Sequence, residues 1–450
     1  MTNFRWIICA LLFFATTVNY LDRQVLSLTW PDFIAPQFGF TKGDYGNITG
    51  CFTLAYAVAM LFAGKAVTWL GTKRGYLWSI FLWSLAACAH ALIGWGAALV
   101  MSVAVWAFLG CRLLLAVGEA GNMPAAVKTV AEYFPPKDRA FAASIFNAGS
   151  SVGAMAAPLL IPPLAKVCGW EWAFVAIGAL GFVWMGFWTF LYDAPERSPR
   201  VNAAELAYIG EADGGADAEP SDGRRVSFWT CLGRRQTWAL VWARVVTDGV
   251  WWFLLFWTPL YIKDQFGYEA FSREGMSLMC TLYVIVTVLS VALCKLPTWF
   301  VTARAMRPVD GRMVSMLLFA CVPLCALGAQ PLGRLSAWWP VVLIGVAAAG
   351  HQAWSANVFA LIGDLYPKRA VAMLTGISQF ASGLGSFLVN KYLAGAVFVA
   401  AEARGESFSF LGFSGNEAGY MVLFTYCAFA YLVGWAGLKA LVPHGEKASV

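Results

Sequence analysis

The residues of this 450-residue chain that are best suited to chemistry are ionisable side chains inside long apolar segments. Asp22 and Arg23 are adjacent in the first such segment, where lipid cannot solvate a charge. Arg23 stays charged at any working pH, and its planar guanidinium matches a carboxylate, so it is a candidate for binding an anionic solute. Helical periodicity places Asn19 and Tyr20 on the face of Arg23 and turns Asp22 elsewhere. Asp22 is a candidate proton carrier; the alternative is a structural ion pair that holds the first segment to a neighbour.

The fourth long apolar segment carries a second pair of charges, Arg112 and Glu119. Seven residues separate them, so an α-helix places both side chains on one face. Glu119 is the second candidate proton carrier, and Arg112 is a candidate to tune its proton affinity. The alternative is a fixed Arg112–Glu119 ion pair that does not titrate.

The tenth segment is unusually polar between His351 and Asn357. A core helix would carry Leu and Val there. The amides of Gln352 and Asn357 suit sugar hydroxyls, and the face of Trp354 can pack on a pyranose ring. The alternative, open for Trp354 above all, is hydrogen bonding and packing between helices. His351 is a candidate for substrate binding or for a proton relay.

Single polar side chains in other apolar segments are additional binding candidates: Tyr56, Asn147 and Gln379. Trp251 and Trp252 are either pocket walls or anchors at the membrane interface. The chain has no phosphate-binding loop, and its three histidines and eleven scattered cysteines lack metal-ligand spacing. We therefore expect no catalytic residue, no metal and no cofactor, and a protein that is not an enzyme.

The elements that position these residues are apolar helices. Of the residues, 60% are hydrophobic and 12% charged, about half the charge usual for soluble domains. Because a span needs roughly 20 apolar residues, the sequence predicts twelve of them, near 6–28, 48–69, 76–95, 98–118, 141–165, 172–192, 238–262, 275–301, 312–330, 337–362, 370–399 and 418–442. The predicted fold is an all-α membrane protein with two pseudo-symmetric six-helix bundles, 1–192 and 238–450, joined by a hydrophilic cytoplasmic linker, 193–237.

Two further patterns support this organisation. Lysine and arginine are concentrated in the loops on one side, which places both termini in the cytoplasm, and the net charge of +6 reflects this topology rather than nucleic-acid binding. The run from Glu132 to Ala142 matches the run from Asp364 to Ala372, as expected for parallel repeats. In this alignment Glu119 falls opposite His351, so both are expected to face the space between the two halves.

Several runs together carry a family pattern: Asn19-Tyr-Leu-Asp-Arg-Gln24, Arg112 with Gly118-Glu-Ala-Gly-Asn122, Glu132-Tyr-Phe-Pro135, and Gly350-His-Gln-Ala-Trp-Ser-Ala-Asn357 with Asp364-Leu-Tyr-Pro-Lys-Arg-Ala370. They resemble the hexuronate transporters, which belong to the anion:cation symporter branch of the major facilitator superfamily. The resemblance covers nearly the whole chain.

The resemblance implies uptake of glucuronate and galacturonate, or of aldonates such as galactonate, together with protons. By resemblance, Arg23 binds the substrate carboxylate, Asp22 and Glu119 are protonated, and Tyr56 and Gln379 line the pocket. The expected partners are a small sugar-acid anion, protons and the lipid bilayer, with no nucleic acid. The expected location is the bacterial inner membrane, and the expected state is a monomer.

Three positions depart from the family pattern. Thr68 replaces the acid that normally helps to hold the cytoplasmic gate, so we expect a less strongly held outward-facing state. Relatives tend to have proline at the position of Gly249 and lysine at that of Leu260. The alternatives are therefore a transporter of another monocarboxylate (an aldonate, quinate or an aromatic acid) or a non-transporting solute sensor of the same fold.

Overall fold

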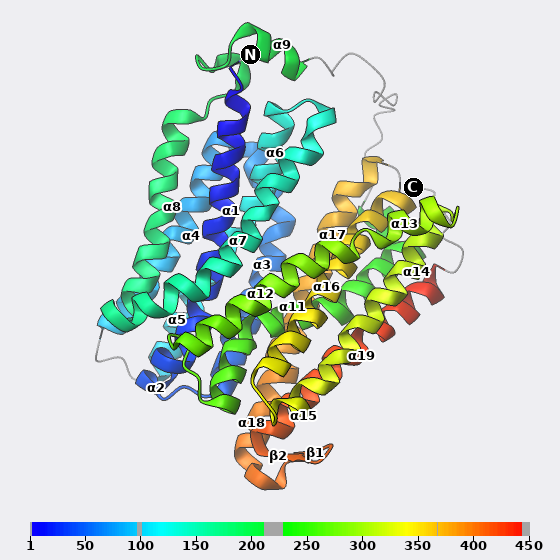
Figure 1. Ribbon diagram of the computed structural model, residues 1–450. Helices are drawn as coiled ribbons and strands as arrows, with labels where there is room; N and C mark the ends of the chain where they lie inside the picture. Colours follow the sequence, from blue (N-terminus) through cyan, green and yellow to red (C-terminus); the bar gives the residue numbers. More distant parts are fainter. Residues whose placement is uncertain (1, 97–100, 211–227, 367, 443–450) are drawn as a thin grey trace. The chain divides into compact units, whose positions relative to one another are not determined.

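The computed structural model describes residues 2–96, 101–210, 228–366 and 368–442. Figure 1 shows that these residues form long helices joined by short connections, with one short hairpin drawn near α18. The contacts divide the chain into two compact units. Unit 1 comprises Met1–Thr29 and Ala59–Arg224, and unit 2 comprises Trp30–Val58 and Arg225–Val450.

Unit 1 is built from helices of the N-terminal part of the chain: α1 (Phe4–Thr29), the second half of α3 (Lys42–Leu70), α4 (Thr72–Trp95), α5 (Met101–Ala120), α6 (Asn122–Tyr133), α7 (Pro136–Cys168), α8 (Trp170–Leu191), η2 (Pro195–Arg197) and α9 (Ala203–Gly210). Helix α1 packs mainly against α7, and α4 packs against α5 and α8. Glycines allow the α1–α7 contact: a Cβ atom on Gly149 would lie 2.5 Å from the carbonyl oxygen of Phe13, and one on Gly153 would lie 2.5 Å from that of Thr17. Small residues at such crossings let membrane helices approach closely.

Unit 2 contains the C-terminal helices and the segment Trp30–Val58. Its elements are η1 (Trp30–Ile34), α2 (Ala35–Phe38), the first half of α3, α10 (Phe228–Leu232), α11 (Arg235–Phe266), α12 (Arg273–Leu293), α13 (Leu296–Ala303), α14 (Pro308–Cys321), η3 (Val322–Gly328), α15 (Ala329–Gly333), α16 (Trp338–Leu365), α17 (Lys368–Phe387), η4 (Leu388–Gly395), α18 (Ala396–Arg404), η5 (Gly405–Ser407), β1 (Ser409–Phe410), β2 (Phe413–Ser414) and α19 (Gly415–Leu441). Helix α11 packs against α16, α17 and α19, and α12 packs against α16. Strands β1 and β2 pair antiparallel.

The predicted helical membrane fold is confirmed. Among the described residues, eleven helices are long and apolar enough to cross a membrane. The one remaining predicted span, 337–362, which is the tenth in sequence order, coincides with the 28-residue helix α16. Positions 98–100 of the predicted fourth span and 211–227 of the predicted linker lie outside the described residues. The division into bundles at 192 and 238 stays a prediction.

Candidate functional site

The two strongest sequence candidates in unit 1 form an ion pair with each other. Nε of Arg23, on α1, lies 2.6 Å from Oε2 of Glu119, on α5, and the two side chains are 6% and 0% exposed. The guanidinium of Arg23 also lies over the ring of Tyr20, 5.1 Å from its centroid, as the helical spacing predicted. Arg23, the candidate for binding an anionic solute, is therefore already paired with the carboxylate of Glu119, a candidate proton carrier.

Asp22 and Glu119 have incomplete sets of hydrogen bonds. Asp22 is 1% exposed, and neither of its carboxylate oxygens has a hydrogen-bond partner among the described residues. The same is true of Oε1 of Glu119. Asp22 interacts electrostatically with Glu119 and with Arg112, so these charges form one cluster. A buried carboxylate that lacks hydrogen bonds is costly in its ionised form. Protonation would therefore stabilise the buried carboxyl groups of Asp22 and Glu119.

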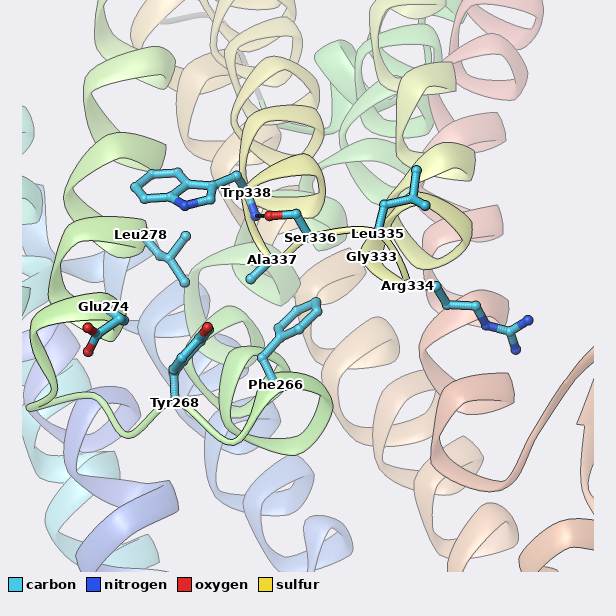
Figure 2. Close-up of a pocket in the computed structure, with 10 residues that line it drawn as sticks. All are labelled: Phe266, Tyr268, Glu274, Leu278, Gly333, Arg334, Leu335, Ser336, Ala337 and Trp338. Carbon is cyan, nitrogen blue, oxygen red and sulfur yellow. Dashed lines mark hydrogen bonds between the residues drawn. The ribbon is translucent and has the colours of Figure 1, made fainter.

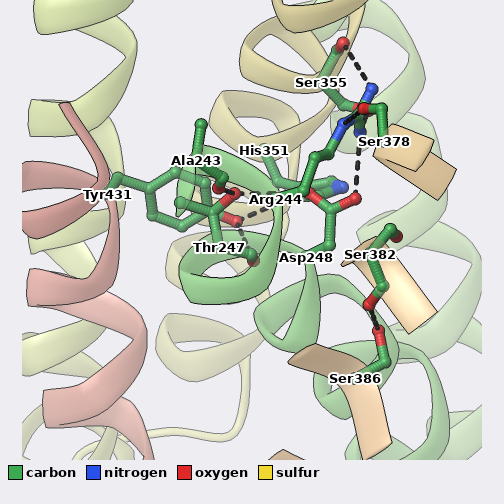
Figure 3. Close-up of polar contacts among 10 residues, drawn as sticks. All are labelled: Ala243, Arg244, Thr247, Asp248, His351, Ser355, Ser378, Ser382, Ser386 and Tyr431. Atoms are coloured by element: carbon green, nitrogen blue, oxygen red, sulfur yellow. Dashed lines mark hydrogen bonds and ion pairs between the residues drawn. The ribbon is translucent and has the colours of Figure 1, made fainter. Parts of the chain in front are cut away.

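Unit 2 contains a buried charge pair that the sequence analysis missed (Figure 3). Nη1 of Arg244 donates to Oδ2 of Asp248 at 2.9 Å and to Oγ of Ser355 at 2.7 Å. Nε of Arg244 donates to Oγ of Ser378 at 3.1 Å, so this one side chain joins α11, α16 and α17. The i, i+4 spacing of Arg244 and Asp248 in an apolar segment was the available signal. Arg244 lies close to the start of its span, where a charge can reach the interface, so the spacing alone did not single it out.

His351 is held in place beside this pair (Figure 3). Its Nδ1 lies 2.8 Å from Oη of Tyr431, which in turn lies 3.3 Å from the backbone oxygen of Thr247. The ring of Trp251 stacks on the imidazole at a centroid distance of 5.5 Å, with 11° between the planes. Trp251 is thus part of a packed aromatic pair with His351.

Two of the predicted sugar-binding residues, Trp354 and Asn357, are buried and contact neighbouring helices of unit 2. Trp354 is fully buried, with its ring edge-on to that of Tyr431 at 5.7 Å. Nδ2 of Asn357 donates to the carbonyl oxygen of Ala353, and Oδ1 accepts from Arg312 at 3.1 Å. Asn357 thus connects α16 to α14 through Arg312, and Trp354 packs on α19 through Tyr431.

The remaining candidates are half-buried or exposed. Tyr56 and Gln379 are half-buried in unit 2, and Tyr56 lies near Trp252 with ring centroids 6.3 Å apart. Gln352 is also half-buried. Asn147, on α7 of unit 1, is exposed. The sequence candidates are thus divided between the units: Tyr20, Asp22, Arg23, Arg112, Glu119 and Asn147 are in unit 1, and Tyr56, His351, Gln352, Trp354, Asn357 and Gln379 are in unit 2.

Unit 2 also has a cavity of about 420 Å³ where α11 ends and α16 begins (Figure 2). Phe266, Tyr268, Glu274 and Trp338 line it, together with Arg334, whose guanidinium pairs with Glu417 at 3.1 Å. No sequence candidate lines this cavity. It is therefore separate from the charges described above.

Long apolar helices with charges buried among them define a multi-pass membrane protein. A model of the Major Facilitator Superfamily matches residues 12–390, and the chain belongs to that superfamily. The family resemblance seen in the sequence is confirmed, as is the expectation of a transporter rather than an enzyme.

Curated relatives and solved structures agree with this assignment. The chain is 28% identical over 387 residues to the hexuronate transporter of Escherichia coli (strain K12), covering 85% of each protein. It is 30% identical over 266 residues to the galacturonate transporter of Dickeya chrysanthemi, covering 59% of this chain and 74% of that protein. A bacterial homolog of the human lysosomal transporter Spinster, solved in an inward-facing, unoccupied conformation, has the same fold, with a TM-score of 0.71, 18% identity and 99% coverage of each chain.

Proposed function

We propose that this protein is a proton-coupled symporter that imports a sugar-acid anion, a hexuronate such as glucuronate or galacturonate, by alternating access. The observation that carries the proposal is the buried Arg23–Glu119 ion pair. It joins the best carboxylate-binding group of unit 1 to a titratable acid. The named substrates of the bacterial relatives support a hexuronate as the solute.

The pair suggests a mechanism of competition for one guanidinium. While Glu119 is ionised, its carboxylate occupies Arg23 and excludes a solute carboxylate. When Glu119 takes up a proton, Arg23 is released and binds the solute through charge-assisted hydrogen bonds. Loss of the solute on the cytoplasmic side lets Glu119 release its proton and pair with Arg23 again. Asp22, buried without hydrogen bonds, is the second protonation site.

Protonation also has an electrical role. Moving an uncompensated anion inward against the membrane potential costs about 2.3 kcal/mol per charge at 100 mV. A proton carried with the anion removes that cost. In this proposal Arg112 adjusts the proton affinity of the acids, while Tyr20, Tyr56, Asn147, His351, Gln352 and Gln379 contribute to solute binding.

The proposed setting is the inner membrane of a bacterium, with both termini in the cytoplasm and a monomer as the working unit. The asymmetric distribution of lysine and arginine supports the orientation. The bacterial sources of the relatives support the membrane.

Transport into vesicles made with the purified protein tests this proposal. We expect glucuronate to cause proton influx, and galacturonate to compete with uptake of labelled glucuronate more strongly than galactonate, quinate or benzoate. Competition by one of the other acids but not by galacturonate would move the substrate assignment to that acid. Glucuronate binding without any movement of solute or protons into the vesicles would favour the alternative of a non-transporting solute sensor.

A further inference from the structure

The cavity of unit 2 lies where four helix ends meet. Helix α11 ends at Phe266, α12 begins at Arg273, α15 ends at Gly333 and α16 begins at Trp338. The cavity volume of about 420 Å³ falls within the range of small-molecule binding sites. None of the residues proposed to bind the transported solute lines it. The cavity is therefore large enough for a small organic molecule of its own.

Aromatic side chains form much of the cavity wall. Phe266, Tyr268 and Trp338 line it, and Figure 2 shows the first two directed toward the α12 and α16 side. Phe266 is fixed by an edge-on contact with Tyr261, with ring centroids 5.8 Å apart and 86° between the planes. Tyr268 and Trp338 are 37% and 48% exposed, so their rings are open to a ligand. The negative faces of such rings attract cations.

Tyr261 adds an unpaired hydroxyl group next to this wall. The side chain is 2% exposed, and its Oη atom has no hydrogen-bond partner among the described residues. A Cβ atom on Gly333, which lines the cavity, would lie 3.4 Å from this oxygen. Buried hydroxyl groups are normally hydrogen-bonded, so the hydroxyl of Tyr261 indicates a polar partner at this wall.

The charge that remains available in the cavity is negative. Two charged side chains line it, Arg334 and Glu274. The guanidinium of Arg334 pairs with Glu417 at 3.1 Å and lies over the ring of Phe413, 4.5 Å from its centroid. The carboxylate of Glu274 makes no ion pair or hydrogen bond with the described residues. The carboxylate of Glu274 is therefore the charge that a ligand can use.

The helix ends at the cavity do not reverse this preference. Oγ of Ser272 caps α12 by accepting from the N–H of Gly275 at 2.9 Å. At the start of α16, Ser336 accepts from the N–H of Trp338 at 3.4 Å and from that of Trp339 at 3.2 Å. An uncapped helix N-terminus counts for about half a positive charge. The full charge of Glu274 thus exceeds what remains of the two capped ends, and the cavity favours a cation over an anion.

We propose that this cavity binds an organic ammonium ion, with the charged nitrogen beside Glu274 and its alkyl groups against Phe266, Tyr268 and Trp338. Aromatic faces recognise quaternary ammonium groups in this way, and a nearby carboxylate adds to the attraction. The ion is either a free small amine or the headgroup of a zwitterionic phospholipid, because Trp338 and its neighbour Leu335 are exposed, as in an aromatic belt at the membrane interface. Its charge is opposite to that of the proposed solute, so the site is distinct from the transport pathway.

Binding of labelled choline to the purified full-length protein in a maltoside detergent tests the proposal. Equilibrium dialysis gives the affinity, and unlabelled competitors give the specificity. Neohexanol has the shape of choline with a carbon atom in place of the charged nitrogen, so it should compete at least about tenfold more weakly than choline. Glucuronate should not compete. Equal competition by neohexanol, or displacement of choline by glucuronate, would overturn the assignment of the cavity to a cation.

Two pairs of variants connect the binding to this cavity. Glu274→Gln should weaken choline binding by about tenfold, whereas Glu269→Gln, an exposed acid that does not line the cavity, should leave it unchanged. Trp338→Leu should weaken it several-fold. The control Trp339→Leu removes the next residue, which is 49% exposed and does not line the cavity. All four side chains are exposed, so the variants should unfold near the native temperature. Equal affinities within either pair would overturn the site.

The lipid around the protein distinguishes the two sources of the ammonium group. The protein is placed in nanodiscs of phosphatidylglycerol alone or of phosphatidylglycerol mixed with phosphatidylcholine. Weaker choline binding in the mixed nanodiscs would identify the phospholipid headgroup as the occupant, because it competes for the cavity. Equal choline binding in both would identify a free amine. Absence of choline binding in detergent and in phosphatidylglycerol nanodiscs would overturn the proposal.

Discussion

Each unit buries an arginine beside a carboxylate, but the two pairs are satisfied to different degrees. In unit 2, Arg244 donates to Asp248, Ser355 and Ser378, and Thr247 donates to the second oxygen of Asp248 at 3.3 Å. In unit 1, Arg23 pairs with one oxygen of Glu119, and the other oxygen has no hydrogen-bond partner among the described residues.

This difference separates a scaffold from a working site. A buried charge that is fully hydrogen-bonded gains nothing by changing partners, so it fixes the helices that it joins. A buried acid with an unused oxygen gains from a proton or a new donor, so its state depends on solute and pH. We assign Arg244 and Asp248 to the first kind, and Arg23, Glu119 and Asp22 to the second.

The largest expected effect is on folding, from loss of the satisfied arginine. Arg244→Ala leaves Asp248 charged and buried, which costs about 3–5 kcal/mol when one member of a buried pair is removed. We expect a large drop in the thermal unfolding temperature of the purified protein. The double variant Arg244→Met Asp248→Leu removes both charges and should regain most of that loss. A native unfolding temperature for Arg244→Ala would contradict the scaffold role.

The next largest effect is on binding, from loss of the arginine in unit 1. Arg23→Ala removes the group proposed to hold the solute carboxylate, and glucuronate affinity should fall by about 2–4 kcal/mol, within the range for a buried charged partner. Arg23→Lys should recover only part of the lost affinity, since an ammonium group cannot offer the planar fork of a guanidinium. Isothermal titration calorimetry measures the glucuronate affinity of both variants. Normal binding by Arg23→Ala would make the carboxylate assignment wrong.

The coupling of transport to protons should depend on the carboxyl group of Glu119 rather than on Arg23. Glu119→Gln keeps the size of the side chain and removes its titration, so exchange of labelled for unlabelled glucuronate should continue. Accumulation driven by a proton gradient should be lost. With one proton per solute, a gradient of one pH unit supports about a tenfold accumulation, and this is the amount that Glu119→Gln should lose. Counterflow and gradient-driven uptake in the same vesicle preparation give the two values. Gradient-driven accumulation at the native level would remove Glu119 from the coupling mechanism.

The smallest effect concerns a fully satisfied acid in unit 1, Glu205 of α9. It accepts hydrogen bonds from the hydroxyl of Thr2 and from the backbone N–H groups of Phe4 and Arg5, and it pairs with Arg5 at 3.2 Å. Burial alone would raise the pKa of Glu205, but these hydrogen bonds and the charge of Arg5 lower it below 4.5. The contact is therefore complete above about pH 4.5 and is lost as the pH falls through the lowered value.

Glu205→Gln should destabilise the first turn of α1 by about 1 kcal/mol, which is typical for loss of a helix cap. Hydrogen exchange of the amides of Phe4 and Arg5 gives the measure, and in the native protein their protection should fall only at acid pH. Arg307→Ala, which breaks an exposed pair with Asp310, is the matched control and should leave these amides unchanged. Equal protection in Glu205→Gln would mean that α9 does not cap α1.

Sequence periodicity predicted the helices and the local contact of Tyr20 with Arg23, because residues three apart on a helix are neighbours. It did not predict the Arg23–Glu119 pair, whose members are 96 positions apart and meet only when α1 and α5 pack. For Trp354 it left two alternatives, sugar binding and packing between helices, because periodicity does not show which neighbours a buried ring contacts. The sequence argument used lysines only as loop charges, and the aspartate partners of Lys42 and Lys263 became visible in the folded unit.

The most direct test of the central claim is proton uptake on binding. The binding enthalpy of glucuronate is measured near neutral pH in buffers with different ionisation enthalpies, and the slope gives the number of protons taken up. If the solute displaces Glu119 from Arg23, the native protein should take up about one more proton per bound anion than Glu119→Gln does. Equal proton uptake by the two proteins would show that Glu119 does not exchange its hold on Arg23 for a proton.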